Sequence, residues 1–127
     1  SVIIQTYYPE NSIIKAAVTK NYSLFYTQQI TEREKFLFPP FCFILKLTCV
    51  RKSSSSAQKA SYKLYHWITE LPLSIQTSAP TPSFVEKHNN NYSWQIIIKS
   101  KKRTDLTTIV ASLPVNCNFN IDPTNLL

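Results

Sequence analysis

Four cations in the stretch KSKKR are the residues of this chain best suited to bind a ligand: Lys99, Lys101, Lys102 and Arg103. They lie between a segment of alternating apolar residues and a segment of helical spacing, so we expect them where a strand ends and a helix begins. Free backbone N–H groups at a helix start, together with nearby cations, favour an anion. The alternative interpretation is a solvated run of charge without a ligand.

The residues around this stretch divide into outward and inward positions. Gln95 alternates with Trp94 and Ile96 and is predicted to point outward, which makes it a candidate contact. Trp94 has the ring needed to stack on a base, but its inward parity favours the core. His66 and His88 have no carboxylate pattern beside them, so we predict surface residues and not metal ligands or catalytic bases.

Composition limits the classes of function. Lys and Arg outnumber Asp and Glu by 14 to 7, and the net charge of +7 favours an anionic partner, nucleic acid first and an acidic peptide second. A basic surface without a partner is the alternative. The sequence has no glycine, which excludes the glycine-rich phosphate loops and the GxSxG elbow. We therefore expect no catalysis, and no cofactor, in this chain.

The cysteines and the apolar runs indicate a compartment. Cys42, Cys49 and Cys117 show no CxxC spacing, which argues against a zinc site and suits a reducing environment. Cys42 and Cys49 lie seven residues apart in one predicted strand, so they should point to opposite faces as core thiols. No apolar run approaches the roughly 18 residues of a membrane span, and no signal peptide is recognisable. The predicted location is cytoplasmic, with no membrane partner.

The elements that must position these residues follow from apolar spacing. From residue 41 the pattern predicts strand, helix, strand, strand, helix and strand, at about 41–50, 57–71, 73–77, 92–99, 106–113 and 115–121. The last serine of RKSSSS is a candidate cap for the first of these helices. The proline-containing stretch up to residue 91 is expected to be a loop. This order is the split β-α-β-β-α-β arrangement, an α+β fold with two helices on one face of an antiparallel sheet.

Residues 1–40 do not belong to that unit. The apolar run at residues 2–4 predicts a buried strand, and two helices follow at about 12–18 and 22–35, separated by Asn21 in a left-handed conformation. Such a strand needs neighbours that this segment does not contain. We therefore expect residues 1–40 to be the end of another domain with a linker, and residues 41–127 to be a complete small domain.

Five stretches carry a resemblance: VIIQTYYPE at 2–10, FPPF at 38–41, APTP at 79–82, YSWQIIIK at 92–99 and IDPTNLL at 121–127. In order and in spacing they resemble one family, the bacterial replication-restart helicases called primosomal protein N′ or PriA. The similarity is to the C-terminal end of the family's proteins and covers nearly the whole chain. Ala79 departs from the family, which tends to have glycine there.

The resemblance implies a parent protein that couples ATP hydrolysis to 3′→5′ unwinding of DNA at abandoned replication forks. That parent would bind ATP, Mg and two zinc ions through motifs that this sequence lacks. Residues 1–40 would be the end of its second helicase lobe and a linker. Residues 41–127 would be the C-terminal domain, which contacts DNA, the single-stranded-DNA-binding protein and other primosome proteins.

The resemblance also assigns a partner site. In the family, a basic residue at the position of Arg103 is expected to bind the acidic C-terminal tail of the single-stranded-DNA-binding protein. A glutamine usually assists it one turn later, where this chain has Thr107.

A second basic region of the family is weaker here. Residues 87–93 read KHNNNYS in place of an arginine-rich and glycine-rich loop, so Lys87, and His88 when protonated, are the cations that remain. Asn89 and Asn90 are predicted to preserve the turn, because asparagine tolerates positive φ better than most residues.

Two other classes of function stay open on the sequence. One is a stand-alone RNA-binding module with a ferredoxin-like fold. The other is a small phosphohydrolase on the same scaffold, although its anion loop would normally be built with glycines, and this chain has none.

Overall fold

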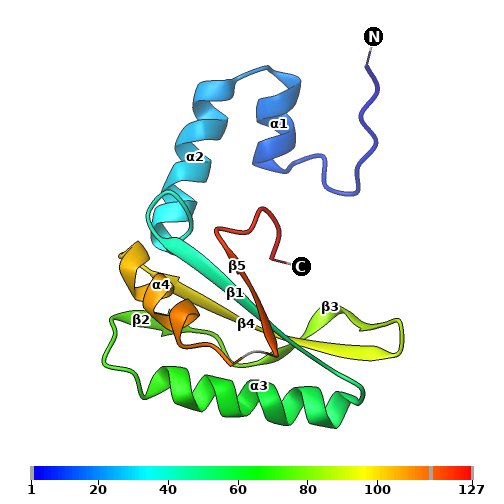
Figure 1. Cartoon of the computed structure of the whole chain (residues 1–127). Coiled ribbons are helices and arrows are strands. Elements are labelled where there is room, and N and C mark those ends of the chain that lie inside the picture. The colour runs from blue at the N-terminus through cyan, green and yellow to red at the C-terminus, as the bar shows by residue number, and fades with distance from the viewer. Residues whose placement is uncertain (1, 115, 127) are drawn as a thin grey trace. The chain divides into compact units, whose positions relative to one another are not determined.

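A computed structural model describes residues 2–114 and 116–126, which form four helices and five strands (Figure 1). The helices are α1 (Ser12–Val18), α2 (Tyr22–Lys35), α3 (Ser54–Thr69) and α4 (Arg103–Ala111). The strands are β1 (Phe43–Arg51), β2 (Ile75–Thr77), β3 (Thr81–His88), β4 (Asn91–Ser100) and β5 (Cys117–Ile121). The chain divides into two compact units, Ser1–Phe36 and Leu37–Leu127.

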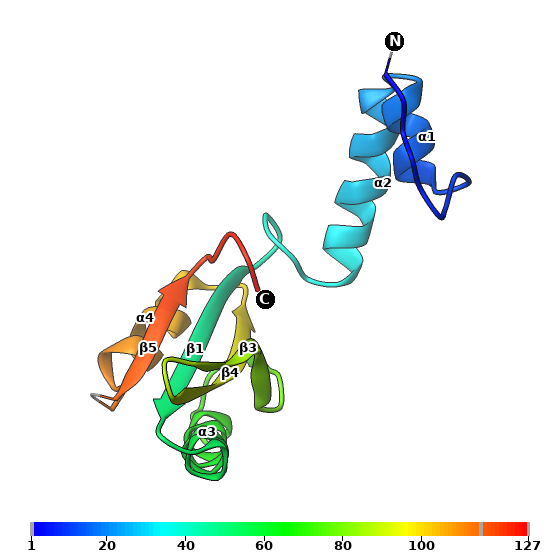
Figure 2. The same ribbon diagram turned by 90° about the vertical axis from the view of Figure 1, so that its right-hand side faces the viewer.

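All five strands belong to the second unit and form one antiparallel sheet. The strand order is β2-β4-β1-β5, and β3 also pairs with β4. Figure 2 shows β5, β1 and β4 side by side. Since β4 lies between β1 and β2, and β1 between β4 and β5, each of α3 and α4 connects strands that are not neighbours. The α+β class predicted from the sequence is confirmed.

The core lies between one face of this sheet and the two helices. Leu45 is opposite Ile98 and Leu47 is opposite Ile96, and none of the four is more than 1% exposed. Cys49 and four helical residues complete the cluster: Leu64 and Ile68 from α3, and Leu106 and Ile109 from α4. The alternation that predicted these strands therefore identifies the face that the helices cover.

β3 is a strand where the sequence predicted a loop. It pairs with β4 next to β2, along the same edge, and its register shifts between Pro82 and Lys87. A proline is tolerated here because β3 is an edge strand, where an N–H on the open side is not needed for pairing. The proline in β3 therefore does not exclude a strand at an edge of the sheet.

Asn89 and Asn90 join β3 to β4 and form the tip of a hairpin, at the right of Figure 1. Their φ angles are 47° and 57°, and His88 pairs with Asn91 across them. A two-residue loop with two positive φ angles is a type I′ turn, which matches the twist of the flanking strands. The prediction that these asparagines keep the turn without glycine is confirmed.

The first unit contains α1 and α2, each with an asparagine cap. The Asn11 side chain accepts the Ile13 N–H at 2.8 Å, and the Asn21 side chain accepts the Leu24 N–H at 3.0 Å. The prediction of a left-handed Asn21 is wrong, because Lys20 takes the positive φ of 54° and leaves Asn21 free to cap α2. No helix in the described ranges is long and apolar enough to cross a lipid bilayer.

The strand predicted at the beginning of the chain is not formed. Residues 2–6 have no regular structure, and Val2 and Ile3 are 88% and 92% exposed. High β propensity is insufficient here because a strand forms only against a partner strand, and no strand lies within 2–36.

Two smaller predictions need correction at element ends. The cap of α3 is Ser53 and not the last serine of the run, because Ser53 Oγ accepts the Ser56 N–H at 3.3 Å. The alternation along 115–121 predicts that Phe119 faces inward. Phe119 is opposite Leu47 but is 53% exposed, because β5 is an edge strand that the helices cover incompletely. Residue 115, predicted to start this strand, lies outside the described residues.

The hairpin turn provides a test of backbone strain. Asn90→Ala should lower the free energy of unfolding by about 1 kcal/mol, because a left-handed backbone is unfavourable for a residue with a Cβ. Asn90→Gly should leave it unchanged or raise it, since glycine has no such penalty. Urea unfolding measures both, with Asn118→Ala at an exposed, extended position as the matched control. Equal stability of the alanine and glycine variants would contradict the strain argument.

Candidate functional site

The structure brings the four predicted cations together where β4 ends and α4 begins. We call Lys99, Lys101, Lys102 and Arg103 the basic cluster. Lys99 is near the end of β4, Lys101 and Lys102 form the connection, and Arg103 is the first residue of α4. Lys101, Lys102 and Arg103 are exposed, while Lys99 is half-buried.

A buried serine holds this connection in place. Ser100 is 3% exposed, and its hydroxyl donates to the Asp105 carboxylate at 2.7 Å while it accepts the Lys102 N–H at 3.0 Å. Asp105 lies in the first turn of α4, where a negative charge is favourable for the helix dipole. An incoming anion would therefore gain more from the side-chain cations than from the helix N-terminus.

Arg103 has a carboxylate beside it. Its guanidinium lies 3.7 Å from the Asp122 carboxylate and 5.9 Å from the centre of the Phe43 ring. Asp122 is held by β1, because Asp122 Oδ1 accepts the Ile44 N–H at 3.0 Å and the Ile44 carbonyl accepts the Asp122 N–H at 2.7 Å. The Arg103 side chain is still 61% exposed, so an external anion can reach it but must share it with Asp122.

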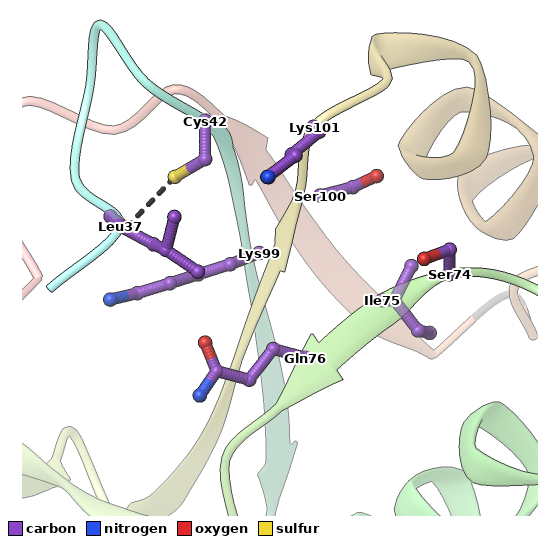
Figure 3. A pocket seen from close by; sticks show the side chains of 8 residues that line it. All are labelled: Leu37, Cys42, Ser74, Ile75, Gln76, Lys99, Ser100 and Lys101. Carbon is purple, nitrogen blue, oxygen red and sulfur yellow. Dashed lines mark hydrogen bonds between the residues drawn. The ribbon is translucent and has the colours of Figure 1, made fainter. Parts of the chain in front are cut away.

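Lys99 and Lys101 line a pocket of about 260 Å³, shown in Figure 3. In this view Lys99, Lys101 and Gln76 extend to the same side, while Ser100 points away from them. Lys99 Nζ lies 3.8 Å from the centre of the Phe38 ring, a cation–π contact that orients the ammonium group. This opening is the concave part of the basic cluster.

Cys42 lines the same pocket as a neutral thiol. Burial raises its pKa, although the nearby Lys99 cation opposes the shift, and the thiol donates to the Leu37 carbonyl at 2.9 Å. Cys42 and Cys49 are both buried, which confirms the core-thiol interpretation for these two. His66 and His88 are exposed, as predicted.

The structure separates Lys87 from the basic cluster, while Gln95 lies nearer to it. Lys87 is opposite Tyr92, with its Nζ 5.5 Å from the ring centre. Tyr92 and Lys99 are seven residues apart on β4, roughly 23 Å at the rise of a strand. Gln95 shares the face of β4 with Lys99, four residues or roughly 13 Å away, and its amide donates to the Leu126 carbonyl at 3.2 Å.

Thr107 lies one turn after Arg103 on α4. Its hydroxyl donates to the Thr104 carbonyl at 2.9 Å, within its own helix. Three residues of the site were not predicted to contact it: Ser100, Phe38 and Asp122. Asp122 is 78 residues from the N–H group that it accepts, so sequence spacing cannot reveal it.

Ser100→Ala tests whether the buried hydroxyl positions the basic cluster. The change leaves the Lys102 N–H and the Asp105 carboxylate without their partner, so the free energy of unfolding should fall by about 1–3 kcal/mol. Thr107→Ala, which removes an exposed hydroxyl from the same helix, should change it by no more than about 0.5 kcal/mol. Urea unfolding of the two variants side by side gives the comparison, and equal losses would show that Ser100 has no special role.

Known proteins with similar sequences point to one family. Residues 34–122 match the primosomal protein N C-terminal domain. The replication restart protein PriA of Synechocystis is 29% identical over 99 residues, which is 77% of this chain and 12% of that protein. The PriA proteins of Bacillus subtilis and Borreliella burgdorferi are 25% and 30% identical, over 88% and 86% of this chain.

The aligned regions make up 14% of the Bacillus protein and 17% of the Borreliella protein, so the chain spans less than a fifth of the length of these relatives. The matched domain covers the whole five-stranded sheet with α3 and α4, and therefore also the basic cluster. The chain belongs to the PriA family of replication restart proteins and contains its C-terminal domain.

Proposed function

We propose that this chain is a DNA-binding and partner-binding module of a replication-restart helicase and catalyses no reaction by itself. The observation that carries the proposal is the basic cluster, where four cations gather at one junction of a chain with net charge +7. In the parent helicase, ATP, Mg and zinc would be bound outside these residues.

We also propose that residues 1–40 complete a helicase lobe and link it to a C-terminal domain at 41–127. The support is the amount of apolar surface in the first unit. Among its described residues, Ala16 is the one buried hydrophobic side chain, while Ile13, Val18 and Leu24 are 43%, 61% and 45% exposed. Surface of this kind is typical of a segment that packs against further protein.

The DNA contact that we propose is made to phosphates. Lysine and arginine side chains at a strand–helix junction can contact successive phosphates of DNA without contacting the bases. The binding would therefore be independent of the DNA sequence. Lys99 and Lys101 border the pocket, and Lys102 and Arg103 extend the positive charge onto α4. Other primosome proteins would contact other surfaces of the same domain.

The salt dependence of single-stranded DNA binding tests this proposal. Four cations on phosphates predict a log–log slope near −3, at roughly −0.7 for each phosphate. Replacing Lys99, Lys101 and Lys102 by alanine should reduce the slope to near −1, because about one contact remains. Fluorescence anisotropy with a labelled oligonucleotide measures both.

The matched control replaces Lys59 and Lys63, two exposed lysines on α3, and should keep the wild-type slope. An affinity that does not change between about 50 and 200 mM salt would exclude the basic cluster as a phosphate site.

The partner contact that we propose is between Arg103 and the acidic C-terminal tail of the single-stranded-DNA-binding protein. A guanidinium can donate two parallel hydrogen bonds to one carboxylate. Arg103 is exposed enough for this, and Asp122 beside it would hold the guanidinium until the tail arrives. Thr107 would lie next to the bound tail, one helical turn away.

Substitutions at both members of this ion pair test the tail site in the intact helicase. Arg103→Ala should weaken binding of a labelled tail peptide about tenfold or more, and Arg103→Lys should recover part of the loss, because lysine cannot form the forked contact. Asp122→Asn keeps the oxygen that accepts the Ile44 N–H but removes the competing charge, so tail binding should stay equal or become stronger. Equal affinity in the wild type and in Arg103→Ala would show that Arg103 is only a structural partner of Asp122.

A further inference from the structure

Two thiols face each other across the pair of strands β1 and β5. Cys49 and Cys117 are directly opposite in the register, and their Sγ atoms are 3.4 Å apart. A disulfide bond is about 2.05 Å long, so a small side-chain movement would bring the sulfurs to bonding distance. We propose that Cys49 and Cys117 form a redox modification site, which a small disulfide of the glutathione type converts to a cross-strand disulfide.

Access to the pair is from one side. Cys49 is 1% exposed, whereas Cys117 is half-buried and lines an open pocket of about 430 Å³. Arg51 and Lys63 line the same pocket, and their positive charges attract an anion. Trp67 and other side chains of α3 add apolar surface to its lining. Glutathione disulfide carries several carboxylates, so this pocket suits it. Cys117 is therefore the sulfur that the small disulfide reaches, and Cys49 is the one that resolves the adduct.

A hydrogen bond joins the two thiols, so one proton lies between the two sulfur atoms. The hydrogen bond from Cys117 lowers the pKa of Cys49 to about 6, against the opposing effect of burial and with help from the Arg51 cation. The same hydrogen bond, together with burial, raises the pKa of Cys117. The pair thus titrates as a unit, and around neutral pH its negative charge lies mainly on Cys49, with Cys117 as the hydrogen-bond donor. A thiolate is the form that attacks a disulfide.

The exchange proceeds in two steps. When the shared proton moves to Cys49, the Cys117 thiolate attacks the small disulfide, which forms a mixed disulfide on Cys117 and releases one small thiolate. That thiolate takes the proton from Cys49. The Cys49 thiolate then attacks the Cys117 sulfur and releases the second small thiolate. The protein dithiol loses two electrons, the small disulfide gains them, and one proton leaves on a released thiol.

The third cysteine serves as an internal control. Cys42 lies just before β1, seven residues from Cys49 and roughly 23 Å away at the rise of a strand. Its thiol is already engaged with the Leu37 carbonyl. It should neither pair with the other two nor be required for their reaction.

The experiment treats the 127-residue chain with excess oxidised glutathione and quenches the reaction with acid. After removal of the glutathione, the remaining thiols are alkylated in denaturant near neutral pH, and the intact mass is read. The wild type should lose two hydrogen atoms and keep one alkylated cysteine, and peptide mapping should link Cys49 to Cys117. Cys42→Ala should behave in the same way except for the lost alkylation site. The oxidised wild type should also melt several degrees higher, because the bond joins residues that are 68 apart in the chain.

Two variants separate the roles of the sulfurs. Cys49→Ala should stop at a glutathione adduct on Cys117, and Cys117→Ala should give no adduct at Cys49. A stable adduct on Cys117 in the wild type, a link that includes Cys42, or three alkylated thiols after treatment would each overturn the proposal. If an alanine variant is unfolded by circular dichroism, the peptide map of the wild type still decides.

Discussion

β1 pairs with β4 along its whole length, from Phe43 opposite Ser100 to Arg51 opposite Tyr92. This pairing brings the apolar residues of two strands onto one face, where α3 and α4 bury them. Because the side-chain period of a strand is two, a slip of one residue would turn the whole apolar set toward the uncovered face. The position of the basic cluster depends on the same register, since it follows directly from the end of β4.

The core and the candidate site are connected through a few polar contacts. Ser100 is the last residue of β4, and its hydroxyl fixes the first turn of α4, so the strand end and the helix start cannot move independently. Asp122 also links a strand to α4, since it contacts both Ile44 of β1 and Arg103 of α4. Arg103 therefore has a structural partner inside the fold and an exposed surface outside it. An anionic ligand that binds Arg103 must therefore compete with Asp122 for the guanidinium group.

A sequence without glycine must place positive φ angles on other residues. The described chain does so at Lys20, Leu37, Asn89, Asn90 and Asp122. The hairpin uses asparagine, whose side chain makes the left-handed region less costly than for most residues. At Asp122 the unusual backbone coincides with the contacts to β1 and Arg103. The backbone conformation and the ion pair are then maintained by the same set of hydrogen bonds.

Local patterns in the sequence determined the parts of the fold that depend on period and propensity. The alternation in β1 and β4 predicted which residues are buried, and the apolar spacing of α3 and α4 predicted which side of each helix faces the sheet. The four cations of KSKKR were also predicted to be a candidate site from the sequence alone. Only the tertiary structure decided that Val2 and Ile3 form no strand, that β3 does, and that Lys87 is far from Lys99. It also decided that Cys49 meets Cys117 and that Arg103 meets Asp122. These outcomes depend on which segments become neighbours. Contacts between different elements, such as Cys49 with Cys117 or Ile44 with Asp122 at 68 and 78 positions apart, leave no periodic signal in the chain.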